Sequence, residues 1–581
     1  MRSAVLFVWT GILAATAQSA SSASWIERSN QNARILLDVE ARYAPEGAGS
    51  LGVSGLDEQI SIPAPDRAER IRHDTEEALK TLRARLSAEQ DSLVKQDLEI
   101  LIKSGERDNR LSLAEEKYLL PYRNVARTVY FGIASLLDDQ VASARRPSAV
   151  VRLRRYAGLE EGYTPITVRA EKVFREKLKV PGLLGPAKAE VEQDIANMSD
   201  FSNGIGLLLE KYKMTGYQEE YAKLKTQLSE YAEFLRKEVL PKARSDFRLP
   251  PDLYAIGLEN FGVDYTPAEL TRLAHQSFTE IQNEMRPLAA KIANEHHLPS
   301  PDYRDVIREL KKDQLSADRI LPLYKERLSE IETILRRKHL VTLPDRPAVI
   351  RLASAAETAQ QAAPHMRPPR LIGNQGERGQ FVLPAGTIGA DGKPLKYDDF
   401  TFSAAAWTLT AHEARPGHEM QFAAMIERGV SQARAIFAFN STNVEGWGLY
   451  AEWFMLPYMP DEGKLISLQL RLLRAARAFV DPELQQGKLT PQQVREILQN
   501  DVVLSKAFAT EEVDRYTFRS PGQAVSYFDG YMRLREIRAA AEKVLGSKFN
   551  VQRFHDFILS QGLLPPDLLR KAVMTEFVGK S

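Results

Sequence analysis

Apolar residues recur every three or four positions along most of this chain, the pattern of helices that bury one face. In the N-terminal half, the pattern covers residues 67–103, 114–138, 168–179, 190–213 and 217–238. The least helical stretch is 364–400, in which residues 380–384 (QFVLP) predict a short edge strand. We therefore expect a mainly helical protein with at most a small β element.

Two later helical stretches place polar side chains on apolar faces. In the first, steps of three and four run through Phe402, Ala405, Leu409 and His412, and after Pro416-Gly417 they resume with His418, Phe422 and Met425. In the second, one face carries Glu445, Leu449, Glu452 and Leu456. A carboxylate on an apolar face requires a partner, such as a metal ion or an arginine.

The segment 412–418 (HEARPGH) carries the candidate chemistry. A zinc-binding helix usually spaces its histidines four apart, whereas His412 and His418 are six apart and would diverge on a regular helix. Pro416-Gly417 predicts a break that returns His418 to His412, because proline ends the hydrogen-bond ladder and glycine tolerates a distorted backbone. The two histidines and Glu445 then predict a Zn²⁺ site with one open position, for which Glu452 is the competing third ligand.

Glu413 directly follows the first histidine, which suits a general base. Zinc lowers the pKa of a bound water from about 15.7 towards 7. Glu413 would take a proton from that water and pass it to the leaving amine. The oxyanion that forms needs a second donor besides the metal.

Residues 410–421 (TAHEARPGHEMQ) resemble the signature of the domain-of-unknown-function 885 (DUF885) family. Similar segments follow in order at 444–452 (VEGWGLYAE), at 515–516 and 521–530, and at 554–556 and 562–565. The family consists of large, mostly bacterial proteins predicted to be zinc metallopeptidases. The resemblance implies a two-lobed helical fold around a deep cleft. It places Tyr527 as the donor to the oxyanion, with His555, Tyr531 and Arg515 as further candidates.

The chain departs from the family pattern after Arg477 and Asp481. The family commonly continues with a glycine and a histidine, whereas this chain reads Pro482-Glu483-Leu484. A catalytically inactive periplasmic binding protein is therefore one alternative to a peptidase. An amidase or imidase acting on a non-peptide substrate is another, because the same water attack serves any acyl carbon. Glu413 favours a hydrolase, since a structural zinc site needs no free base.

Residues 1–23 have the features of a signal peptide. Arg2 precedes an apolar run at 4–15 that is too short to span a bilayer comfortably, and small residues then suit cleavage after Ala20 or Ala23. We expect export to the periplasm, or secretion from a host without an outer membrane, and no stable membrane insertion after cleavage. An uncleaved anchor is the alternative. The helical pattern is interrupted near residue 245, before the predicted connection at 249–252 (LPPD). This interruption predicts an N-terminal helical region (24–245) and a catalytic region (246–581).

The net charge and the lack of cysteine limit the classes of partner and of chemistry that we expect. The net charge of the 581 residues is +1, which gives no reason to expect a nucleic acid or an anionic membrane. The expected partner is a peptide or a small amide. Cysteine is absent, which excludes disulfides, cysteine zinc ligands, thiol nucleophiles and lipid attachment through an N-terminal cysteine.

Overall fold

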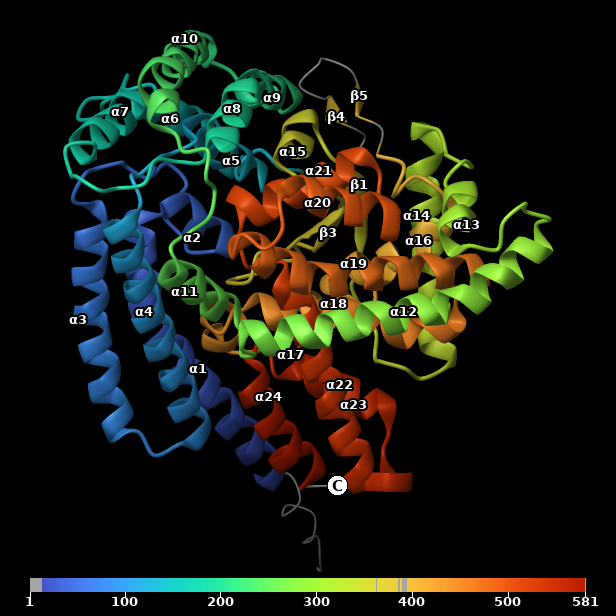
Figure 1. Cartoon of the computed structure of the whole chain (residues 1–581). Helices are drawn as coiled ribbons and strands as arrows, with labels where there is room; N and C mark the ends of the chain where they lie inside the picture. The colour runs from blue at the N-terminus through green and yellow to red at the C-terminus, as the bar shows by residue number, and fades with distance from the viewer. Residues whose placement is uncertain (1–12, 362, 385–386, 389–393, 396, 580–581) are drawn as a thin grey trace, which may run out of the picture.

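The computed structural model describes residues 13–579 except 362, 385–386, 389–393 and 396. It is mainly helical with a small three-stranded sheet, which confirms the predicted fold class (Figure 1). The first twelve residues of the predicted signal peptide lie outside the described part. No helix within the described part is both long enough and apolar enough to cross a membrane.

The N-terminal part contains α1 (Leu13–Tyr43), α2 (Pro45–Leu51), α3 (Arg67–Ala88), α4 (Ser92–Tyr118), α5 (Val125–Ala134), α6 (Ser148–Tyr156), α7 (Ile166–Lys177), α8 (Lys188–Ala196), α9 (Met198–Lys211) and α10 (Gln218–Phe234). The middle contains α11 (Pro251–Phe261), α12 (Pro267–Glu295), α13 (Tyr303–Leu310), α14 (Ala317–Arg337), β1 (Val349–Leu352), α15 (Ala355–Gln360), β2 (His365–Arg367), β3 (Gln380–Leu383), β4 (Thr387–Ile388) and β5 (Pro394–Leu395).

The C-terminal part contains α16 (Ser403–Leu409), α17 (His418–Arg428), α18 (Ser441–Met455), α19 (Asp461–Gln485), α20 (Pro491–Glu496), α21 (Lys506–Asp514), α22 (Val525–Leu545), α23 (Val551–Ser560) and α24 (Pro566–Ala572). Short 3₁₀ or π segments are η1 (Ser143–Arg145), η2 (Leu235–Val239), η3 (Leu240–Lys242), η4 (Thr410–Ala414), η5 (Ala433–Phe437), η6 (Leu456–Tyr458), η7 (Ile497–Asp501), η8 (Arg515–Arg519), η9 (Gly546–Lys548) and η10 (Val573–Val578).

Some of the predicted helical stretches contain two helices. The stretch 67–103 divides because the side chain of Asp91 accepts a hydrogen bond from the backbone N–H of Leu93 and so caps the start of α4. The stretch 190–213 divides at Asn197, between α8 and α9. The stretch 217–238 is one continuous helical segment formed by α10 and η2.

The core joins segments from the two ends of the chain. Helices α1, α3 and α4 lie side by side, and their apolar faces share one core with α18, α22 and α23 (Figure 1). Within this layer, buried Asp97 of α4 accepts hydrogen bonds from Arg434 and Ser431 at 2.8 and 2.6 Å. Helices α5–α10 form a separate apolar cluster, and α12 lies along α19 over a third.

Strand β3 is the centre of its sheet, so the predicted edge strand is wrong in its position. It pairs with β1 in parallel and with β2 antiparallel, and all four of its residues are buried. Both of its edges are therefore occupied, and β3 offers no free edge to an extended peptide.

Candidate metal centre

The helix that carries His412 is broken before His418, as predicted. Helix α16 continues as the π turn η4, which contains His412, and Arg415 then takes an extended conformation. The Arg415–Pro416 peptide bond is cis. Helix α17 begins at His418, so the two histidines project from separate helical segments.

Two residues within the break, Gly417 and Arg415, determine its geometry. A Cβ at Gly417 would overlap the backbone of His412, so only glycine fits where the chain doubles back. The buried guanidinium of Arg415 donates to Glu419 and to Glu332, each at 2.7 Å. These charged contacts hold the extended residue between the two helical segments.

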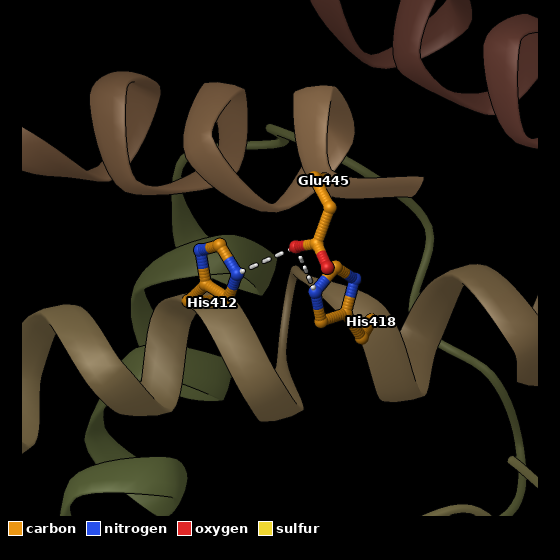
Figure 2. A group of neighbouring side chains, drawn as sticks. All are labelled: His412, His418 and Glu445. Carbon is orange, nitrogen blue, oxygen red and sulfur yellow. Dashed lines mark ion pairs between the residues drawn. The ribbon is translucent and has the colours of Figure 1, made fainter. Parts of the chain in front are cut away.

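Glu445 of α18 points towards both imidazoles (Figure 2). Its Oε2 lies 3.5 Å from Nε2 of His412 and 3.3 Å from Nε2 of His418. Two ligand atoms that are each about 2.1 Å from a tetrahedral ion lie about 3.4 Å apart. This oxygen is buried and accepts no hydrogen bond from the described residues. The three side chains therefore fit a metal ion.

The imidazoles rest directly on the backbone of α18. A Cβ at Gly448, one helical turn after Glu445, would lie 2.6 Å from Cε1 of His412 and 2.9 Å from Cε1 of His418. Real side chains do not approach an imidazole so closely. Glycine at 448 is therefore part of what allows both rings to approach Glu445.

Glu452 contacts the opposite side of His412. Its Oε1 lies 2.6 Å from Nδ1 of His412, and its Oε2 accepts a hydrogen bond from the Thr408 hydroxyl at 2.7 Å. Arg474 places Nη2 3.3 Å from the same Oε1. A carboxylate on the outer nitrogen is the usual support of a metal-binding histidine. The geometry thus separates the two competing glutamates.

The cluster stabilises a cation. Burial lowers the pKa of His412, but the adjacent carboxylates of Glu445 and Glu452 outweigh this effect and raise the pKa to about 9. Burial raises the pKa of Glu445, but the two imidazoles hold it well below its ordinary value. A positive charge between these groups, either a proton or a metal ion, is therefore electrostatically favoured.

Glu413 lies beside the cluster without occupying the position of Glu445. Its Oε1 is 4.0 Å from Nε2 of His412, and its side chain is 12% exposed. A carboxylate at this place can accept a proton from a water molecule that reaches the cluster.

Tyr527 reaches the cluster from α22. Its ring stacks near His412 with the ring centroids 6.2 Å apart, and its hydroxyl oxygen accepts a hydrogen bond from Nη2 of Arg515 at 2.9 Å. Because the arginine donates, the tyrosine keeps its own proton for another acceptor. Helices α18 and α22 approach so closely that a Cβ at Gly446 would lie 2.6 Å from Cα of Gly530.

His555 is not part of the cluster, contrary to the sequence prediction. It packs on the face of α18 that carries Tyr450 and Phe454, with its ring stacked 4.5 Å from that of Phe454. Its Nε2 bonds the Tyr450 hydroxyl at 2.9 Å, and its Nδ1 bonds the carbonyl of Leu340 at 2.8 Å. Both nitrogens have protein partners, and burial lowers its pKa to about 3.

Sequence reasoning missed the arginines of α19 that surround Tyr527. Arg477 lies 4.5 Å from the centre of the Tyr527 ring and forms a two-bond pair with buried Glu512 at 2.6 and 2.7 Å. Arg474 supports Glu452, as described above. Their spacing of three on an apolar helix was the available signal. Further along α19, the side chain of Asp481 accepts a hydrogen bond from the backbone N–H of Gly522. The side chain of Glu483 forms a hydrogen bond with His275 of α12.

Comparisons with known proteins cover most of the chain. The sequence model of a family described as "Bacterial protein of unknown function (DUF885)" matches residues 45–573. A candidate lipoprotein from Colwellia psychrerythraea is 17% identical with a TM-score of 0.75, over 95% of this chain and 100% of that chain. A candidate lipoprotein of unknown function from Shewanella oneidensis is 19% identical with a TM-score of 0.70, over 95% and 99%. Both similarities establish the fold. No curated protein matches the chain.

Proposed function

We propose that this chain, which belongs to the DUF885 family, is a zinc-dependent hydrolase that cleaves peptide bonds. The main support is the convergence of His412, His418 and Glu445 on one point, with Glu413 beside them. A purely structural zinc site has four protein ligands and needs no adjacent carboxylate, whereas a catalytic site has three and keeps one position open.

Each side chain has a distinct role in this proposal. His412, His418 and Glu445 would hold zinc, which supplies a polarised water molecule and a Lewis acid for the carbonyl oxygen. Glu413 accepts the proton of the attacking water and delivers it to the leaving nitrogen.

Two further groups support the reaction. The Tyr527 hydroxyl, whose oxygen is fixed by Arg515, donates its proton as a hydrogen bond to the developing oxyanion. Glu452 accepts a hydrogen bond from the N–H at Nδ1 of His412, which leaves the lone pair of Nε2 directed at the cluster.

We place the activity outside the cytoplasm, in the periplasm of a diderm host. The support is the predicted signal peptide, together with two structural relatives described as candidate lipoproteins. This chain contains no cysteine and so cannot carry a lipid on an N-terminal cysteine.

The test is metal content and peptide cleavage by the purified protein, beside Glu413→Gln and the control Glu427→Gln. Glu427 lies on α17, the helix that begins at His418, and pairs with Arg346. We expect about one zinc in each protein, and a loss of about 10² to 10⁴ in cleavage rate for Glu413→Gln alone. Cleavage would be followed by mass spectrometry on a broad peptide mixture.

Three results would contradict parts of the proposal. Absence of metal from all three proteins would refute the site. Undiminished cleavage by Glu413→Gln would refute the assigned base. Zinc without cleavage of any peptide would replace the peptidase by an amidase or imidase acting on a non-peptide substrate.

A further inference from the structure

The segment that joins η8 to α22 forms a turn, and this turn fixes the place of Gln523. Buried Asp481 of α19 holds the turn, because its two carboxylate oxygens accept the backbone N–H of Gly522 at 3.0 and 2.9 Å. The backbone N–H of Gln523 donates to the carbonyl of Ser520 at 3.1 Å. The side chain of Gln523 therefore starts from a defined point of the backbone.

The side-chain oxygen of Gln523 holds the guanidinium of Arg515. It accepts hydrogen bonds from Nε at 2.9 Å and from Nη2 at 2.5 Å, so it lies against one edge of the planar group. Nη2 carries two hydrogens, and the second one is donated to the hydroxyl oxygen of Tyr527 at 2.9 Å. The contact of Nη1 with Glu512 is longer, at 3.4 Å. Because two bonds to one edge fix the plane of a guanidinium, Gln523 determines how Arg515 faces Tyr527.

A closed chain of hydrogen bonds orients the amide of Gln523. The Ser526 hydroxyl donates its one proton to the backbone carbonyl of Gln523 at 2.6 Å. The Ser441 hydroxyl, 2.7 Å away, must then donate to Ser526 and accept from Nε2 of Gln523 at 2.8 Å. With Nε2 directed at Ser441, Oε1 faces Arg515. A reversed amide would place its NH₂ group against the donors of the guanidinium.

This chain of hydrogen bonds joins the helix of a metal ligand to the helix of the oxyanion donor. Ser441 is the first residue of α18 and lies one helical turn before Glu445. Ser526 directly precedes Tyr527 in α22. The side chain of Gln523 lies between the two helices and is therefore placed to set the orientation of Tyr527 relative to the cluster.

We propose that Gln523 is a positioning residue of the hydrolase, whose side-chain oxygen aims Arg515 at Tyr527 and so directs the Tyr527 proton towards the substrate. Because the hydroxyl oxygen accepts from Arg515, the one proton of the hydroxyl is left for the developing oxyanion. Without its acceptor, the guanidinium can turn away and the hydroxyl loses its fixed direction. A misplacement of about 1 Å can cost about 100-fold in rate. This inference rests on the proposed function, but its geometric part is tested without turnover.

The first test is the crystal structure of the Gln523→Leu protein beside that of the wild type. Leucine is similar in size to glutamine and offers no acceptor to Arg515. We expect the guanidinium to rotate, and the distance from its Nη2 to the hydroxyl oxygen of Tyr527 to exceed about 3.5 Å. An unmoved Arg515 would overturn the inference, whether or not the protein hydrolyses peptides.

The second test measures kcat and KM on a fluorogenic peptide built from a sequence that the wild-type protein cleaves. Gln523→Leu should keep its zinc and its KM and lose about 10- to 100-fold in kcat, because the Tyr527 hydroxyl acts in the transition state. In the Tyr527→Phe background, the same change should cost less than about twofold, since the hydroxyl that it orients is gone. Equal losses in the two backgrounds would overturn the inference.

A further variant, Gln523→Glu, separates the two sides of the amide. It keeps an acceptor for Arg515 and removes the donor to Ser441. Positioning through Arg515 predicts that this variant retains most of kcat. A purely structural tie between α18 and α22 predicts that it loses as much as Gln523→Leu, and that result would overturn the inference. Should Gln523→Leu fail to fold, the shorter side chain of Gln523→Asn gives the same comparison.

Gln485→Leu is the matched control. Gln485 is a buried glutamine of α19 that also holds η8, since its Nε2 donates to the carbonyl of Tyr516 at 2.7 Å. Its side-chain oxygen accepts from the backbone N–H of Leu249, at 2.9 Å. This variant should lose stability in urea unfolding and keep its kcat. A loss of kcat equal to that of Gln523→Leu would overturn the inference, because any loosening of η8 would then suffice.

The two proposals fail in different ways. A wild-type protein that cleaves no peptide refutes the peptidase, while the crystal structures still decide whether Gln523 orients Arg515. A peptidase in which Gln523→Leu leaves both Arg515 and kcat unchanged refutes the role of Gln523 alone.

Discussion

Replacing Glu452 by glutamine tests whether this carboxylate supports His412 or binds the metal itself. The structure gives it one short hydrogen bond to Nδ1 of His412, at 2.6 Å, within a fully buried pair. One hydrogen bond to a charged group is worth about 1.5–3 kcal/mol. Zinc affinity should therefore fall about 10- to 100-fold, as is usual for groups behind a ligand. Glu445→Gln replaces a charged ligand by a neutral amide and should lose more than about 100-fold.

The assay is competition for zinc against a chromophoric chelator of known affinity, at constant pH. Asp97→Asn is the matched control, because it also removes a buried carboxylate from an arginine and a hydroxyl. That variant should lose stability in urea unfolding and keep its zinc affinity. The comparison separates an effect on the cluster from an effect on folding.

A reversed order would refute the reasoning. If Glu452→Gln released zinc completely while Glu445→Gln retained it, Glu452 would be the ligand and the geometry of α18 would be wrong. Equal, mild losses in both variants would show that neither carboxylate binds the ion.

Three further outcomes follow from the same geometry. Gly448→Ala should lose zinc because its methyl group would meet both imidazoles, whereas Gly257→Ala, with nothing within 4 Å, should stabilise the helix by up to about 1 kcal/mol; full zinc content in Gly448→Ala would contradict this. Tyr527→Phe should keep its zinc and lose about 10²- to 10³-fold in kcat, and an unchanged kcat would exclude the hydroxyl as oxyanion donor. The pKa of His555 is about 3 when folded and about 6.5 when unfolded, so its neutral form contributes stability above pH 6.5 that is lost as pH falls towards 3. Urea unfolding at pH 7, 5 and 4 should show a flatter pH dependence for His555→Gln, and parallel curves would refute the assignment.

The motif and the helical periodicity predicted much of the site. His412, Glu413, His418 and Glu445 come together because each lies on an inward face. The break between the histidines followed from the backbone chemistry of proline and glycine. Periodicity could not separate Glu445 from Glu452, since residues seven apart share a helix face. Only the position of α18 along η4 decides which nitrogen of His412 each carboxylate meets.

The wrong predictions depended on distant partners. His555 is fully engaged by Tyr450 and by Leu340, which are 105 and 215 positions away in the sequence. The pattern of residues 380–384 correctly indicated a strand, but its two neighbours come from other parts of the chain. The local sequence contains no information about such distant partners. A family resemblance indicates which residue type stands at a position, but it does not indicate which residues that side chain contacts.

The pairing of Asp97 with Arg434 has a consequence for the order in which the protein can fold. These residues are 337 positions apart, and both are buried between α4 and the segment that precedes α18. During synthesis from the N-terminus, α4 emerges long before its counter-charge and before the apolar faces of α18 and α22 that complete its core. The nascent chain therefore stays incompletely packed until its last third is made, and nucleation must wait for contacts of high sequence separation. Such a delay suits the export that we propose for this chain, because the core would still be open while the chain is being translocated.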